Sequence, residues 1–113
     1  MKGYTKINKE RPYEVPYDAL AKEMGDQISQ NKDLREIRLI QGKGLLNMRL
    51  YDLYVANLND IPPINKSEFV AGTDTKELGD VVTKLLNEMA PNDVRIIRSW
   101  RYGKVKWGIL ARE

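Results

Sequence analysis

The spacing of apolar residues along this 113-residue chain changes twice in the same way. Apolar side chains recur at three and four residues over 17–31 and again over 78–89, which is typical of amphipathic helices. After each of these segments the spacing changes to two, over 35–50 and 94–111, which is typical of strands with one buried face. The sequence therefore predicts the order helix, hairpin, helix, hairpin.

This order predicts an α+β fold with two helices packed on one face of a four-stranded antiparallel sheet. Such packing would bury both helix stripes and the apolar face of each hairpin in two layers. A chain of 113 residues is long enough for one compact domain. We expect residues 17–113 to form that domain and residues 1–16 to be a basic N-terminal arm or edge strand.

Both helices carry signals at their ends. Asp18 stands where the first helix should begin, because an acidic side chain favours a helix N-terminus. Asp74 and Glu77 are spaced as a capping box, so the second helix should begin there and stop before Pro91. The residues expected on its buried stripe are Leu78, Val81, Val82, Leu85, Leu86 and Met89.

The hairpin after the first helix has a predicted register that both of its faces support. With Gly42 and Lys43 as a two-residue loop, one face is nearly all apolar. On the other face Glu36 lies opposite Arg49, a charge pairing that a solvent-exposed strand pair favours. The remaining expected pairs are Gln41 with Gly44, Leu39 with Leu46, Arg38 with Asn47, Ile37 with Met48, and Arg35 with Leu50.

The stretch that follows is less regular. Residues 51–58 fit neither spacing, so they are either a bulged extension of the strand or a helical turn. Residues 57–67, which include Pro62 and Pro63, have the composition of a loop. Residues 69–71 could add a short strand.

The hairpin at the C-terminus has Tyr102 and Gly103 as its expected loop. Its register puts Trp100 and Trp107 on the apolar face, with Arg98 opposite Trp107 in cation-π geometry. A longer loop would shift the register and turn both indoles outward, where they could stack on bases. The expected pairs are Arg101 with Lys104, Trp100 with Val105, Arg98 with Trp107, Ile96 with Ile109, and Val94 with Ala111.

The openings of the two hairpins also resemble each other at an offset of sixty residues. A duplicated αββ unit would explain this agreement, and so would chance agreement between short strand segments. The matching positions are Asp33, Leu34, Arg35, Ile37 and Arg38 against Asp93, Val94, Arg95, Ile97 and Arg98.

Positive charge is concentrated in the last fifth of the chain. Residues 94–113 hold six basic side chains and one acidic one, whereas residues 18–93 hold nine basic and thirteen acidic ones. A basic strip on one face of the C-terminal hairpin would attract phosphate groups, and nearby tyrosine rings could stack on bases. The candidate nucleic-acid-binding residues are Arg95, Arg98, Arg101, Tyr102, Lys104 and Lys106, helped by Arg38 and Arg49.

The residue types that are missing exclude several chemistries. The chain has no cysteine and no histidine, which rules out disulfides, zinc fingers and histidine-based catalytic triads. The acidic residues form no cluster at predicted strand ends, so we expect no enzymatic activity, no metal and no cofactor. The first seventeen residues are polar and lack the apolar core of a secretory signal, which favours a cytoplasmic protein.

We therefore expect a small, non-enzymatic nucleic-acid-binding protein that makes backbone contacts largely independent of base sequence. The alternative is a protein-binding or inhibitory module that uses the same face, of the kind that phages and mobile elements encode, with a homodimer as another way to cover that face. A third interpretation is that the basic residues only keep the strands solvated and block edge pairing. The sequence leaves open DNA against RNA and single against double strands.

Overall fold

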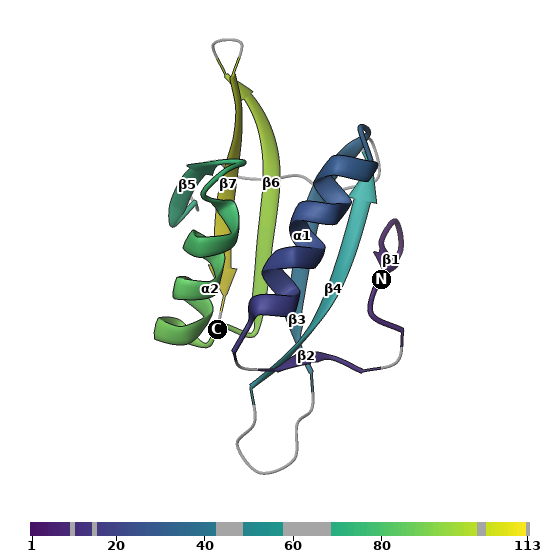
Figure 1. Ribbon diagram of the computed structural model, residues 1–113, viewed down its shortest axis with the longest axis vertical. Coiled ribbons are helices and arrows are strands. Elements are labelled where there is room, and N and C mark those ends of the chain that lie inside the picture. The colour runs from purple at the N-terminus through teal and green to yellow at the C-terminus, as the bar shows by residue number, and fades with distance from the viewer. Residues whose placement is uncertain (10, 15, 43–48, 58–68, 102–103, 113) are drawn as a thin grey trace.

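The computed structural model describes residues 1–9, 11–14, 16–42, 49–57, 69–101 and 104–112, with only the backbone of residues 99–101, 104 and 105. These described residues form seven strands and two helices (Figure 1). In chain order these are β1 (Thr5–Lys6), β2 (Tyr13–Glu14), α1 (Asp18–Gln30), β3 (Leu34–Gln41), β4 (Leu50–Asn57), β5 (Ala71–Asp74), α2 (Leu78–Met89), β6 (Asp93–Arg101) and β7 (Lys104–Arg112).

All the strands join one antiparallel sheet in the order β1-β4-β3-β6-β7-β5, with β2 also paired to β4. The predicted fold class is therefore wrong, because the sheet has seven strands and not four. The additional strands β1, β2 and β5 are only two to four residues long. They are held by backbone pairing to longer strands, so they leave little trace in the spacing of apolar residues.

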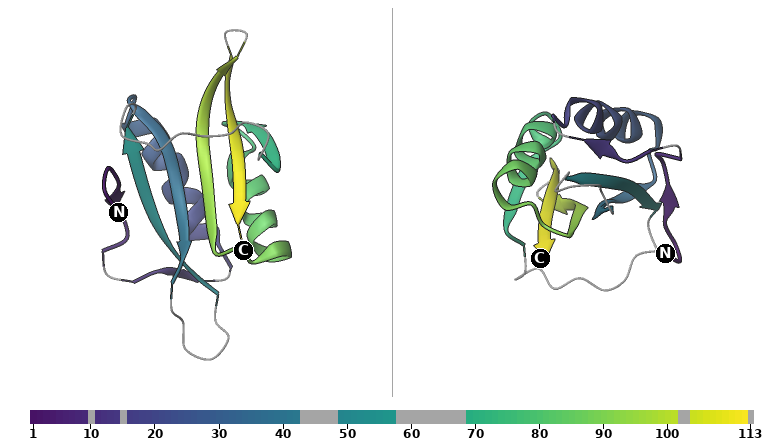
Figure 2. Two further views of the ribbon diagram at one scale, coloured as in Figure 1. Left: turned by 180° about the vertical axis from the view of Figure 1, so that it is seen from behind. Right: turned by 90° about the horizontal axis from the view of Figure 1, so that it is seen from below.

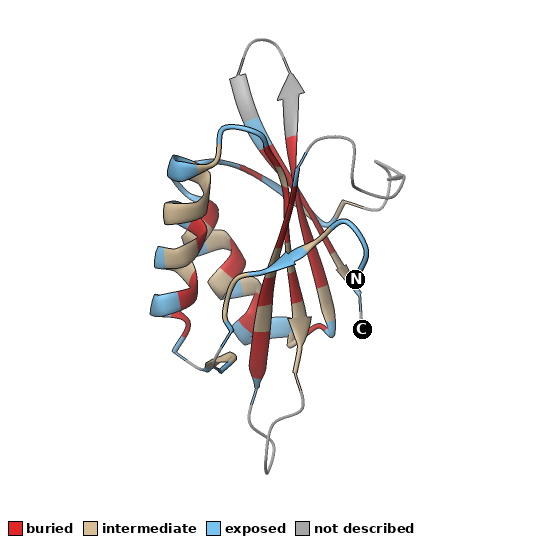
Figure 3. Ribbon diagram, turned by 90° about the vertical axis from the view of Figure 1, so that its right-hand side faces the viewer, coloured by how far each residue is buried: buried red, intermediate tan, exposed pale blue. Residues whose placement is uncertain are grey.

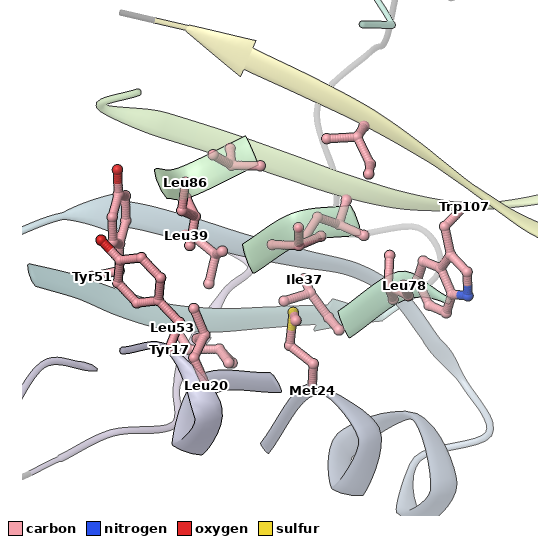
Figure 4. Packing of buried hydrophobic residues seen from close by; sticks show 14 of the residues in the cluster. Tyr17, Leu20, Met24, Ile37, Leu39, Tyr51, Leu53, Leu78, Leu86 and Trp107 are labelled. Carbon is pink, nitrogen blue, oxygen red and sulfur yellow. The ribbon is translucent and has the colours of Figure 1, made fainter. Parts of the chain in front are cut away.

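The hydrophobic core lies between the helices and the sheet (Figures 2 and 3). Figure 4 shows Leu20 and Met24 of α1 packed over Ile37, Leu39 and the side chains of β4. The buried members of this cluster are Tyr17, Leu20, Met24, Leu34, Ile37, Leu39, Tyr51, Leu53, Val55, Leu78, Val82, Leu86, Val94, Ile96, Trp107 and Ile109.

The first helix begins at Asp18 and ends at Gln30, close to its predicted bounds. The second helix begins later than predicted, at Leu78. Asp74 does accept a hydrogen bond of 2.9 Å from the Glu77 backbone N–H, but it lies in β5 and not at the helix start. Neither helix is long and apolar enough to cross a membrane.

The predicted register of the first hairpin is wrong. β3 pairs with residues 50–57, so that Ile37 faces Val55 and Leu39 faces Leu53. Residues 51–58, which fitted neither the helical nor the strand spacing, thus supply most of strand β4. Residues 43–48 lie outside the described residues. The observed pairing has a physical advantage, because it buries three large side chains of β4 against the helices: Tyr51, Leu53 and Val55.

The register of the C-terminal hairpin is confirmed pair by pair from Val94 with Ala111 to Arg101 with Lys104. The proposed offset of sixty is not supported, because Ile37 lies in the core cluster. Ile97, its expected counterpart, alternates with Val94 and Ile96 and faces the other side of the sheet.

Candidate nucleic-acid interface

Arg95 is held inside the protein by Glu36. A β-bulge between Leu34 and Glu36 turns the Glu36 carboxylate away from the core, where it is 0% exposed. Arg95 Nε donates to Glu36 Oε2 at 2.9 Å and Nη2 donates to Oε1 at 2.8 Å. These hydrogen bonds raise the pKa of the Arg95 guanidinium, which is 8% exposed. Arg95 is therefore occupied by a bidentate buried ion pair.

Arg38 is occupied in a similar way. Its guanidinium forms a two-pronged ion pair with Asp93, with Nε donating to Oδ1 at 2.9 Å, and this contact raises the pKa of Arg38. Arg38 also lies over the ring of Tyr4, 5.4 Å from its centroid, and the Tyr4 hydroxyl donates to Glu36 Oε1 at 2.9 Å. The N-terminal arm therefore closes over both ion pairs.

Arg98 lies on the core side of β6 and has no carboxylate partner within the described part of the chain. Its guanidinium sits 5.0 Å from the ring centroid of Trp107, as the sequence predicted, and its Nη1 donates to the Lys32 carbonyl at 3.1 Å. Its Nε is buried without a hydrogen-bond partner. The pKa of Arg98 is lowered mainly by burial and to a smaller extent by repulsion from Arg35.

Arg49 is separated from the other candidates. It is exposed just before β4, and its Nη1 donates to the Asn87 carbonyl near the end of α2 at 3.0 Å. The predicted pairing of Arg49 with Glu36 is wrong, because Glu36 bonds Arg95 and Tyr4 instead.

The β6–β7 ribbon extends beyond its neighbours in the sheet (Figure 1). The pairing of β3 with β6 ends at Ile97, and the pairing of β5 with β7 starts at Lys106. The last two rows of the ribbon, Trp100 with Val105 and Arg101 with Lys104, have no outer neighbour among the described pairings. Lys106 is exposed. Nothing is described of the side chains of Arg101 and Lys104, and Tyr102 lies outside the described residues.

Two turns flank the base of this ribbon, one beside each strand. The hydrogen bond from Arg98 to Lys32 ties the turn between α1 and β3 to β6. The Trp107 indole N–H donates to Thr75 Oγ1 at 3.0 Å and ties the turn between β5 and α2 to β7. These turns carry exposed Lys32 and Lys76, which sequence reasoning missed because each lies in a turn beside an acidic residue.

A second feature lies away from the ribbon. A cavity of about 550 Å³ opens between the N-terminal segment and the start of α1. The cavity is lined by Asn8, Lys9, Arg11, Pro12, Tyr13, Glu14, Pro16 and Ala19.

The structure brings together no set of three acidic side chains fit for a metal ion among the residues that it describes.

Comparison with protein-family models, with curated proteins and with solved structures found no match to this chain.

Proposed function

We propose that this protein binds nucleic acid, without catalysis, through the projecting β6–β7 ribbon. The observation that carries the proposal is the cross-strand pairing of Arg101 with Lys104 at the end of the ribbon. Like charges directly opposite each other destabilise a strand pair. A polyanion beside the ribbon would relieve this repulsion and would release counterions on binding.

The proposed contact residues are Arg101, Lys104 and exposed Lys106, because the ribbon register brings them together. Arg38 and Arg95 are left out, since their guanidinium groups are already paired with carboxylates. Arg49 is left out because it is bonded to the end of α2, and Tyr102 stays a prediction from sequence. The proposed interface is thus smaller than the sequence indicated.

The test is fluorescence anisotropy with labelled single-stranded and duplex oligonucleotides between about 50 and 200 mM salt, the range over which phosphate-driven binding weakens steeply. The variant is the double substitution Arg101→Ala and Lys104→Ala. Its control is the double substitution Lys22→Ala and Lys84→Ala, which removes the same charge from exposed positions on α1 and α2. Circular dichroism and urea midpoints verify that both variants are folded.

We expect the ribbon variant to bind more weakly. The slope of log K against log salt should become shallower by about two, one for each lost phosphate contact. The control should keep the slope of the unmodified protein. If no oligonucleotide binds at low salt, or if both variants lose the same affinity, the proposal fails. The alternative, that the same face binds a protein, would then be tested by pull-down experiments with the same two variants.

A further inference from the structure

Four segments that are distant in sequence meet at the ribbon end of the molecule. They are residues 31–35, which run from the turn after α1 into β3, residues 74–77, which run from the end of β5 to α2, and the ribbon residues 98–101 and 104–107. The hydrogen bonds of Arg98 and Trp107 described above join them. Together they contain seven basic residues and three acidic ones. The acidic residues of these segments are Asp33, Asp74 and Glu77.

The arrangement of these charges has a defined shape. The ribbon stands in the centre, and Lys32 and Lys76 lie on turns beside its two strands. Arg98 adds a buried positive charge at the base of the ribbon with no described carboxylate to balance it. A buried unpaired charge is costly, and an anion close by would lower that cost.

The dimensions of the ribbon limit its ligand. The two residue pairs beyond the neighbouring strands extend the ribbon by about 7 Å along the strand direction, and its two paired strands are about 4.8 Å apart. The major groove of B-form DNA is about 12 Å wide and about 8.5 Å deep, and it admits a two-stranded ribbon. The major groove of A-form RNA is too narrow for side chains to read.

From this arrangement we infer that the ligand is duplex DNA, with the β6–β7 ribbon entering the major groove and Lys32 and Lys76 contacting phosphates on its two sides. The inference rests on the proposed function. The two turns lie beside opposite edges of the ribbon, because β3 pairs with β6 and β5 pairs with β7. Three strand spacings, about 14 Å, separate β3 from β5, which is close to the width of the major groove, about 12 Å.

The experiment compares four labelled probes of matched length and sequence by anisotropy. They are duplex DNA, single-stranded DNA, duplex RNA, and duplex DNA whose cytosines carry glucosylated hydroxymethyl groups that fill the major groove. A fifth measurement adds the minor-groove ligand distamycin to the duplex DNA. The variants are Lys32→Ala and Lys76→Ala, with Lys84→Ala on the exposed face of α2 as the matched control.

We expect glucosylation to weaken binding by about tenfold or more, since it blocks the groove that the ribbon enters, and distamycin to have little effect. Lys32→Ala and Lys76→Ala should each lower the salt slope by about one, and Lys84→Ala should leave it unchanged.

Binding that is equal or tighter for single strands or duplex RNA, or that distamycin blocks, would overturn the inference while leaving nucleic-acid binding intact. So would an unchanged salt slope in both lysine variants. Failure to bind every probe would instead overturn the proposed function itself, so the two failures are distinguishable.

Discussion

Arg95 shows how one residue can look like a binding group in the sequence and act as a structural group in the fold. Its partner Glu36 is 59 positions away in the chain, and the partner of Arg38 is 55 positions away. A sequence pattern read over a few residues places cations on a strand face but does not reveal distant carboxylates on the neighbouring strand. The charges of Arg38 and Arg95 are therefore neutralised inside the molecule.

Replacing Arg95 with methionine should lower the free energy of unfolding by about 3–5 kcal/mol, because it leaves the buried Glu36 carboxylate without its ion-pair partner. Urea unfolding followed by circular dichroism measures this change. The double substitution Glu36→Leu and Arg95→Met should cost less than Arg95→Met alone, since neither charge is then left unpaired. Arg95→Met with unchanged stability and weakened nucleic-acid binding would instead make Arg95 a binding residue.

At the scale of elements, the contact between β7 and the residues just before β5 depends on a glycine. Gly108 lies opposite Ile97, and Phe69 packs directly against it. A Cβ atom added at Gly108 would lie 2.7 Å from two ring carbons of Phe69, which is closer than such atoms approach. The small size of this residue therefore allows the ring of Phe69 to pack against the β6–β7 pair.

We expect Gly108→Ala to destabilise the protein by about 1–3 kcal/mol, the usual cost of overpacking. Its matched control is Gly25→Ala in α1, where no atom lies within 4 Å of the added Cβ. Because glycine is a poor helix former, Gly25→Ala should stabilise the protein by about 0.5–1 kcal/mol. Urea midpoints of the two variants that shift in the same direction would contradict this account of the contact.

The two hairpins differ in how far their registers follow from sequence. Only two residues separate β6 from β7, so the alternation of apolar residues determines that register. The segment between β3 and β4 runs from 42 to 49, and several registers give alternating faces. The choice among them is made by packing, because the observed register brings Tyr51 and Leu53 into the core beneath α1.

Considered over the whole molecule, buried and partly buried tyrosines make the stability depend on pH in the alkaline range. Burial raises the pKa of Tyr51 to about 12 from 10.0, and it also raises the pKa values of Tyr4, Tyr13 and Tyr17. The unfolded chain loses these protons near pH 10, before the folded protein does. Stability from this source is therefore complete below about pH 10 and is lost as the pH rises through the folded-state pKa values.

Urea midpoints measured at about pH 8, 9.5 and 11 should fall steeply only above pH 10. Tyr51→Phe should be less stable than the unmodified protein at pH 8, because it loses the hydrogen bond of 2.6 Å from the Tyr51 hydroxyl to the Pro91 carbonyl. It should also lose less stability between pH 9.5 and 11, since one buried phenol no longer ionises on unfolding. An identical fall in both proteins would show that Tyr51 does not contribute to the pH dependence.

The features that depend on neighbours along the chain could be predicted from the sequence. These are the position of α1, most of α2, the register of β6 with β7, the contact of Arg98 with Trp107, and the exclusion of cysteine and histidine chemistry. Helical and strand spacings act over a few residues, so they can be read directly.

The tertiary structure was needed to show which strands pair across long separations and which charges remain available. It gave the short strands β1, β2 and β5 their partners, moved the partner of β3 to residues 50–57, and paired Arg38 and Arg95 with acids. It also brought Lys32 and Lys76 to the base of the ribbon. Backbone pairing and ion pairs form between residues that are close in space but far apart in the chain. A local pattern of residue types therefore does not predict them.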